Sequence, residues 1–75
     1  MRRGYIKRYI ITDHFGFITD AETGRDSFLH VSVLYKRGLD EKQIAASWGK
    51  TVEYESEWKD HSKPSEEVVD LRLLD

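Results

Sequence analysis

The sequence predicts an all-β fold: a small barrel of five antiparallel strands with one short helix between the third and fourth strands. Two runs close together in the chain, 14–18 and 26–32, place aromatic and apolar residues with the period of two that is typical of strands. Three more runs, 5–12, 51–58 and 68–74, are rich in strand-forming residues. A chain of 75 residues has room for a single domain, 1–75, with a modest core.

The runs 14–18 and 26–32 form a predicted antiparallel hairpin. The connection, residues 21–24, ends in Gly24, where a positive φ is often needed. Alternation places Phe15, Phe17, Phe28 and His30 on one face, and Ile18, Leu29 and Val31 on the other. Two interpretations of the aromatic face remain open from the residues alone. The rings are core, as Phe usually is, or they form an exposed surface on which nucleobases stack.

The first strand, 5–12, carries Lys7 and Arg8, and residues 12–14 form the turn into the second strand. Asp26 is expected to cap the hairpin turn, and Ser32 to end the third strand.

A short helix is predicted over 41–47. Asp40 is its N-cap, Gln43 closes a capping box, and Leu39 packs on Ile44 as a hydrophobic staple. Gly49 supplies the stop signal.

The last two strands follow the helix. In 51–58 we expect Val52, Tyr54 and Trp58 to face inward and Glu53, Glu55 and Glu57 to face water. Residues 59–67 form a polar loop, and 68–74 closes the sheet with Val69, Leu71 and Leu73 on one side. Five strands and one short helix describe an OB-type barrel.

Charge is distributed unevenly along a chain whose net charge is only −2. Residues 1–38 carry seven Lys or Arg against four Asp or Glu, whereas residues 39–75 carry five against ten. The aromatic hairpin therefore lies in the basic half, which favours a local phosphate-binding patch. The sequence has no Cys, which excludes disulfides and thiolate metal sites. It has no apolar run long enough to span a membrane and no apolar leader after Met1, so a cytoplasmic protein is expected.

The segments Gly4-Tyr5-Ile6-Lys7, Phe15-Gly16-Phe17-Ile18 and 26–32 resemble the first three strands of a cold-shock domain. Within them, 15–18 resembles its first ribonucleoprotein motif and 28–32 its second. The resemblance covers residues 3–34, with 49–54 as a fourth strand and 63–69 as a weaker fifth. It implies a protein that binds single-stranded RNA or DNA and regulates transcription or translation as an RNA chaperone. The implied stacking residues are Phe15, Phe17, Phe28 and His30. The resemblance also implies that Lys7 and Arg8 both border this surface, which requires a bulge in the first strand.

The chain departs from the cold-shock pattern at four positions. Arg8 replaces a tryptophan, Asp13 a lysine and His14 a glycine, while Val31 stands at a further aromatic position. Tyr35, or with less support Trp48, could restore a stacking partner from the long connection. The segment 39–48 is an insertion relative to the family, so its helix caps the barrel or contacts a protein partner.

The residue types argue against an enzyme. His14, His30 and His61 are far apart and lack metal-ligand spacing, and no arrangement of Ser or Lys suggests a nucleophile. We therefore expect no catalysis, cofactor or metal. The alternative to nucleic-acid binding is an OB-type protein-interaction module whose nucleic-acid surface has decayed. A third possibility is self-association through a free sheet edge.

Overall fold

The structure is a computed structural model that describes residues 2–58 and 65–74. Within these residues the chain forms five strands and two short α-helices. The strands are β1 (Arg2–Ile10), β2 (Phe15–Asp20), β3 (Asp26–His30), β4 (Thr51–Glu57) and β5 (Glu67–Leu73); the helices are α1 (Val31–Lys36) and α2 (Glu41–Ala45); a 3₁₀ turn spans Ile11–Asp13. No helix in the described part of the chain is long and apolar enough to cross a membrane.

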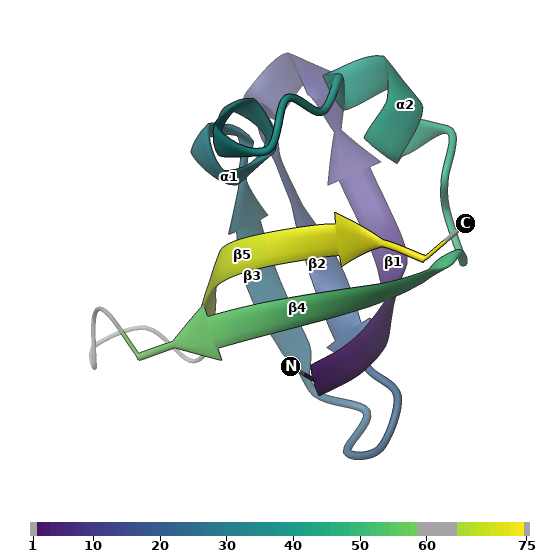
Figure 1. Ribbon diagram of the computed structural model, residues 1–75, viewed down its shortest axis with the longest axis vertical. Coiled ribbons are helices and arrows are strands. Elements are labelled where there is room, and N and C mark those ends of the chain that lie inside the picture. The colour runs from purple at the N-terminus through teal and green to yellow at the C-terminus, as the bar shows by residue number, and fades with distance from the viewer. Residues whose placement is uncertain (1, 59–64, 75) are drawn as a thin grey trace.

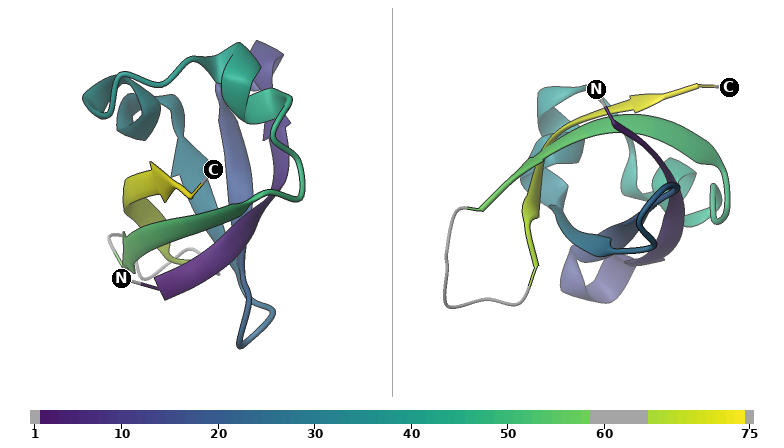
Figure 2. Two further views of the ribbon diagram at one scale, coloured as in Figure 1. Left: turned by 45° about the vertical axis from the view of Figure 1, so that its right-hand side comes forward. Right: turned by 90° about the horizontal axis from the view of Figure 1, so that it is seen from below.

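The strands close into a barrel in the order β1-β2-β3-β5-β4, which Figure 2 (right) shows as a ring. The pairs β1–β2, β1–β4, β2–β3 and β4–β5 are antiparallel. A parallel contact between β3 and β5, at Phe28 opposite Glu67, completes the ring. The predicted all-β, OB-type barrel is confirmed, with one parallel pairing in place of an antiparallel one. The ring is joined between β3 and β5 by a single residue pair, the least extensive pairing among the described strands.

The core fills the barrel and extends under the two helices. The side chains with the least exposure are Ile6, Ile18, Leu29, Val52, Tyr54 and Leu71 from the strands, and Leu34 and Ile44 from the helices. Both helices lie at the same end of the barrel (Figure 1), so Leu34 and Ile44 close that end over the strand residues. Burying a side chain of this size contributes roughly 1.5–3 kcal/mol.

The turn between β2 and β3 is built as predicted, with Gly24 at a φ of 74°. Asp20 fixes the turn because one carboxylate oxygen accepts the backbone N–H groups of Glu22 (2.8 Å) and Thr23 (3.1 Å). The other oxygen accepts the buried hydroxyl of Tyr54 at 3.0 Å. The two backbone N–H groups, Thr23 first, hold the pKa of Asp20 below its usual value.

Helix α1 was not predicted, and it shortens the third strand. The strand was expected to run to Ser32, but β3 ends at His30 and a helix begins at Val31. The His30 side chain acts as the N-cap by accepting the backbone N–H of Ser32 at 3.2 Å. Val31 and Leu34 lie one turn apart and are both buried, so burial of this face overrides the strand preference of the β-branched residues.

Helix α2 is confirmed, in a shorter form than predicted. Asp40 is the N-cap and accepts the backbone N–H of Lys42 at 3.2 Å. Within the described residues, the Gln43 side chain makes no capping-box hydrogen bond to Asp40. The backbone carbonyl oxygen of Gln43 accepts the Ser47 hydroxyl at 2.6 Å. The helix ends at Ala45, and Gly49 follows with a φ of 83°.

A β-bulge changes the predicted inward faces of β4 and β5. Ser56 lies opposite Val68, and Val69 is left as the extra residue. Val68 is therefore buried, while Val69, predicted to face inward, is only half-buried. Trp58, also predicted to face inward, follows the end of β4 and is 46% exposed. The predicted polar loop 59–67 falls largely outside the described residues, and β5 begins at its last residue.

Gly16 allows the paired strands β1 and β2 to approach each other closely. A Cβ at this position would clash with the carbonyl oxygen of Arg8 and lie 2.8 Å from the Cα of Tyr9. Both obstacles are part of the neighbouring strand and cannot rotate away. The glycine between the two phenylalanines is therefore required by the backbone packing of the barrel.

Gly16→Ala is expected to lower the free energy of unfolding by about 1–3 kcal/mol, because the added methyl group overlaps backbone atoms of β1. For a chain of this size, each kcal/mol lowers Tm by roughly 4–8 °C, measurable by thermal denaturation followed by circular dichroism. The control is Gly24→Asn, at a position with open space around it, where Asn tolerates the positive φ and the change should stay within about 0.5 kcal/mol. Unchanged stability of Gly16→Ala would contradict this account.

Candidate nucleic-acid interface

The outer face of β1, β2 and β3 carries rows of side chains that follow the strand register. One row runs from Arg8 through Phe17 to Phe28, and the next from Ile10 through Phe15 to His30. A third row consists of Tyr5, Thr19 and Asp26. We use the term aromatic platform for Phe15, Phe17, Phe28 and His30. The strand pairing thus brings the four predicted stacking residues together.

The rings of the aromatic platform contact one another. Phe15 and Phe28 are stacked, with ring centroids 5.3 Å apart and an interplanar angle of 27°. Phe17 meets both of them edge-on, at 5.8 Å from Phe15 and 6.1 Å from Phe28. His30 extends the cluster at 6.3 Å from Phe28, tilted by 33°. These separations lie within the range of favourable aromatic pairs.

The aromatic platform lies outside the core. Ile18 and Leu29, the inward neighbours of the rings on the same two strands, have no exposed surface. The three phenylalanines are half-buried and His30 is exposed. The hairpin therefore has two apolar faces, of which only one is needed for the interior. The outer face is thus a second apolar surface beside the one that builds the core.

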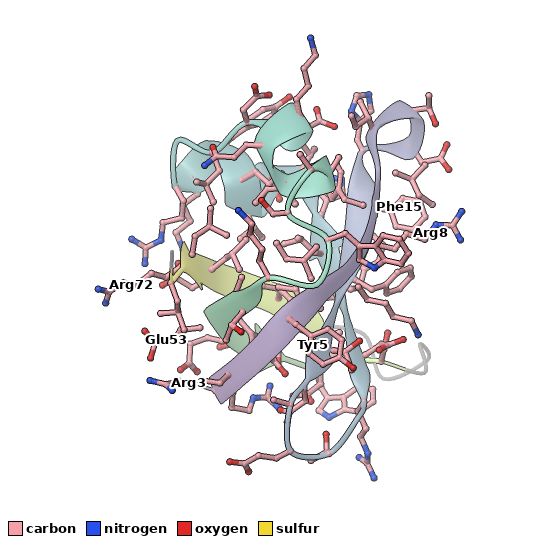
Figure 3. The ribbon with its side chains drawn as sticks, turned by 90° about the vertical axis from the view of Figure 1, so that its right-hand side faces the viewer. Arg3, Tyr5, Arg8, Phe15, Glu53 and Arg72 are labelled. Atoms are coloured by element: carbon pink, nitrogen blue, oxygen red, sulfur yellow. The ribbon has the colours of Figure 1, made fainter. Side chains whose placement is uncertain are left out.

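Lys7 and Arg8 both face outward, as the cold-shock resemblance implied, and the reason is the predicted bulge. The β1–β2 register shifts between Ile6 and Arg8, which leaves Lys7 as the extra residue. Figure 3 shows Arg8 on the same side of the molecule as Phe15. Arg8 forms no ion pair with any residue that the structure describes, so its guanidinium is available to a ligand.

Lys7, by contrast, is already engaged by an acidic residue that the sequence assigned to the turn. Its Nζ donates to Asp26 at 2.9 Å, and the hydroxyl of Thr19 donates to the other oxygen of the same carboxylate at 2.7 Å. Burial raises the pKa of Asp26, but the two hydrogen bonds outweigh it and hold the pKa below its usual value. A charged carboxylate therefore stands at one end of the aromatic platform and neutralises one of its predicted cations.

His30 has a structural role as well as its place in the aromatic platform. Because its Nδ1 accepts the backbone N–H of Ser32, the ring proton of the neutral imidazole is assigned to Nε2. The Ser32 hydroxyl lies 3.1 Å from the same Nδ1. The ring is therefore held in a fixed orientation, with Nε2–H as the remaining donor.

His14, one of the departures from the cold-shock pattern, connects the turn after β1 to helix α2. It has a φ of 59°, and its Nδ1 lies 3.0 Å from a carboxylate oxygen of Glu41. The Tyr9 hydroxyl donates to the same oxygen at 3.1 Å. Burial, followed by the hydrogen bond to Glu41, raises the pKa of Tyr9 above its usual range. This cluster fixes α2 against the barrel, which supports the capping role suggested for the insertion.

The two aromatic residues predicted to supplement the aromatic platform lie in different places. Tyr35 is on α1, 68% exposed, and makes no ring contact with the aromatic platform in the described structure. Trp48 follows α2, is 76% exposed and lies beside Arg8, with which it lines a pocket. Val31, noted as a departure at an aromatic position, is buried at the start of α1. The structure thus brings Trp48, rather than Tyr35, close to the row of Arg8.

Two contributors to this surface were missed in the sequence. Asp26 was expected only to cap the turn, and Tyr5, which is 41% exposed, was not singled out. Both face outward in the row that they share with Thr19. One more step of alternation along the hairpin, from Phe28 to Asp26, would have found Asp26. Tyr5 lies on β1 beyond the bulge at Lys7, where strict alternation from Arg8 fails.

No group of three His, Cys, Asp or Glu side chains that could hold a metal ion occurs in residues 2–58 and 65–74. Comparison with protein-family models finds no match, and neither does comparison with the sequences of curated proteins.

Replacing a ring of the aromatic platform is expected to cost much less stability than replacing its inward neighbour. Phe17→Ala should lower the free energy of unfolding by roughly 1–2 kcal/mol, because it removes ring contacts from a half-buried side chain. Leu29→Ala should lower it by about 2–5 kcal/mol, because it leaves a cavity in the core. Urea denaturation of both variants measures the difference. Equal losses would show that the rings belong to the core.

Proposed function

We propose that this chain binds single-stranded RNA or DNA, with bases stacked on Phe15, Phe17, Phe28 and His30. The observation that carries the proposal is the separation of two apolar faces on one hairpin, with the core complete on the inner face and four contacting rings on the outer one. Stacking accepts any base because every base has a π-face. We therefore expect mild sequence preference and no catalysis.

The charges beside the rings are those expected of a surface that binds single-stranded nucleic acid with modest affinity. Arg8 is available for a phosphate, and Lys7 becomes available when it exchanges Asp26 for a phosphate. Tyr35, which the sequence also suggested as a contact, lies on α1 and makes no ring contact with the aromatic platform in the described structure, so it is not part of this proposal. The strand order and the motifs in 15–18 and 26–32 support the further proposal that the chain is a divergent cold-shock-like protein, acting in the cytoplasm as an RNA chaperone that influences transcription or translation.

The alternative is a protein-interaction module that uses the segment 39–48. Its support is the firm attachment of α2 to the barrel through Glu41, together with the exposure of Lys42 and Gln43 on the outside of that helix. The neutralisation of Lys7 by Asp26 also fits a surface that no longer binds nucleic acid. This alternative requires that single strands are not bound and that changes at Lys42 and Gln43 disrupt a protein complex.

The test is fluorescence anisotropy of labelled oligo-dT and oligo-U. A labelled duplex is the control that shows whether binding requires a single strand. We expect binding to single strands that weakens with salt, with a log–log slope near −0.7 for each neutralised phosphate. Phe17→Ala should weaken binding by about 1–3 kcal/mol, or roughly 5- to 150-fold, because one stacking ring is lost. Leu74→Ala removes an exposed apolar side chain at the end of β5 and should leave binding unchanged.

Two results would contradict the proposal. One is the absence of salt-sensitive binding up to ~100 µM, the weak end of non-specific nucleic-acid affinities, by a chain shown to be folded. The other is equal binding by the wild type and by Phe17→Ala. Either result would direct attention to the protein-interaction alternative.

Asp26→Asn is expected to tighten binding, because it frees Lys7 for a phosphate while the amide oxygen still accepts the Thr19 hydroxyl. The salt slope should become steeper by about 0.7, the effect of one more phosphate contact. Anisotropy titrations across a salt series measure both quantities.

The matched control for Asp26→Asn is Glu53→Gln, which changes the net charge by the same amount on β4. Figure 3 shows Glu53 on the side of the molecule away from Arg8 and Phe15. Equal slopes for Asp26→Asn and the wild type would show that Lys7 does not contact the strand.

A further inference from the structure

A pocket of about 340 Å³ adjoins the aromatic platform and is lined by Arg8, Tyr9, Ala45 and Trp48. Strand β1 supplies the first two residues, and the end of α2 with the following turn supplies the other two. The volume is at the small end of the range, ~300–1,000 Å³, that is typical of pockets for small organic groups. The pocket therefore suits a single ring system rather than a large ligand.

The walls of the pocket differ in chemistry. Tyr9 is nearly buried and is held by its hydroxyl on Glu41, so it forms a fixed apolar wall beside Ala45. Trp48 presents a broad flat ring that is 76% exposed. Arg8 supplies hydrogen-bond donors and no acceptor. An aromatic ring with acceptor atoms at its edge, and with a negative charge close by, matches these walls.

The backbone next to Trp48 is hydrogen-bonded to β1. The N–H of Gly49 donates to the carbonyl oxygen of Ile6 at 2.6 Å, and the N–H of Ile6 donates to the carbonyl oxygen of Lys50 at 3.1 Å. These two hydrogen bonds attach the turn that carries Trp48 directly to β1. The backbone that carries the indole is therefore positioned before any ligand arrives, which reduces the entropic cost of binding.

The pocket also continues the aromatic platform. Arg8 lies opposite Phe17 in the β1–β2 register, and Phe17 lies opposite Phe28 in the β2–β3 register. A strand whose bases stack on the two phenylalanines and that continues across β1 reaches the pocket next.

We propose that this pocket binds one further nucleobase of the bound strand, stacked on the indole of Trp48, while Arg8 donates to the edge of that base or to its phosphate. The inference rests on the proposed function and adds a specific subsite to it. It assigns to Trp48 the supplementary stacking role for which the sequence offered both Tyr35 and Trp48.

The test is an abasic scan. Each nucleotide of an oligo-dT of about six residues, a length that an OB fold can cover, is replaced in turn by an abasic one, and anisotropy gives the affinity for wild type and for Trp48→Ala. We expect one position at which loss of the base weakens wild-type binding by about 5- to 150-fold. At that position the same change should have little effect on Trp48→Ala, because the stacking partner is already missing.

Two comparison variants sharpen the scan. Trp48→Phe keeps a smaller ring and should restore part of the sensitivity at that position. Tyr35→Ala removes the exposed ring on α1, the other residue that the sequence offered for this role, and should leave the wild-type profile unchanged. In Trp58→Phe, Trp48 is the only tryptophan, and its fluorescence should be quenched by the intact oligonucleotide and less by the one that is abasic at that position.

The outcomes separate the two proposals. If the wild type binds no single strand, the proposed function fails. If the wild type binds and Phe17→Ala weakens binding, but the abasic profiles of wild type and Trp48→Ala coincide, the function stands and the subsite is overturned. The subsite is also overturned if Arg8→Ala lowers the salt slope while no position couples to Trp48, because the pocket then holds a phosphate and no base.

Discussion

The close approach of β1 and β2 at Gly16 is the constraint on which the rest of the structure depends. With no side chain between them, the backbone of β2 rests directly on Arg8 and Tyr9 of β1. This contact sits next to the bulge at Lys7, and together they bend the two strands enough for the sheet to close. Closure sends Phe15 and Phe17 outward on a curved surface.

The same contact has effects beyond the hairpin. Beside Gly16, Tyr9 points inward and reaches Glu41, and through this carboxylate the barrel holds helix α2. Helix α2 in turn places the segment that carries Trp48 against β1. A glycine that looks like part of a binding motif is thus also the point from which the end of the barrel is organised.

Alternation was sufficient to predict which residues share the aromatic platform, because period two assigns faces without any knowledge of strand order. The barrel was predicted from the number of strands and from the cold-shock resemblance. Alternation failed where the backbone departs from regular pairing. The bulge in β5 exchanged the roles of Val68 and Val69, which a strict period cannot anticipate. Helix α1 was missed because its N-cap is a histidine and its first residues favour strands, so only the burial of Val31 and Leu34 reveals it.

Partnerships between charges were also beyond the sequence. Lys7 and Asp26 are distant along the chain, and only the β1–β2–β3 pairing, with its bulge at Lys7, brings the two side chains together. The net charges of residues 1–38 and 39–75 indicated a basic region, but they could not show that one of its cations is paired. The position of Trp48 depended in the same way on where α2 ends and on its hydrogen bonds to β1.

His30 is both a member of the aromatic platform and the N-cap of α1, so its ring has little freedom to rotate. An exposed imidazole ordinarily rotates freely and loses that freedom when a ligand orders it. Here the start of a helix has already restricted the ring, since its Nδ1 accepts the N–H of Ser32. Any rotation of the ring toward a partner would remove the N-cap of α1, the helix that carries the buried Leu34. At the His30 end of the aromatic platform, a partner must therefore fit the ring in the orientation that it already has. A partner that needs another orientation loses binding energy to the cost of uncapping α1.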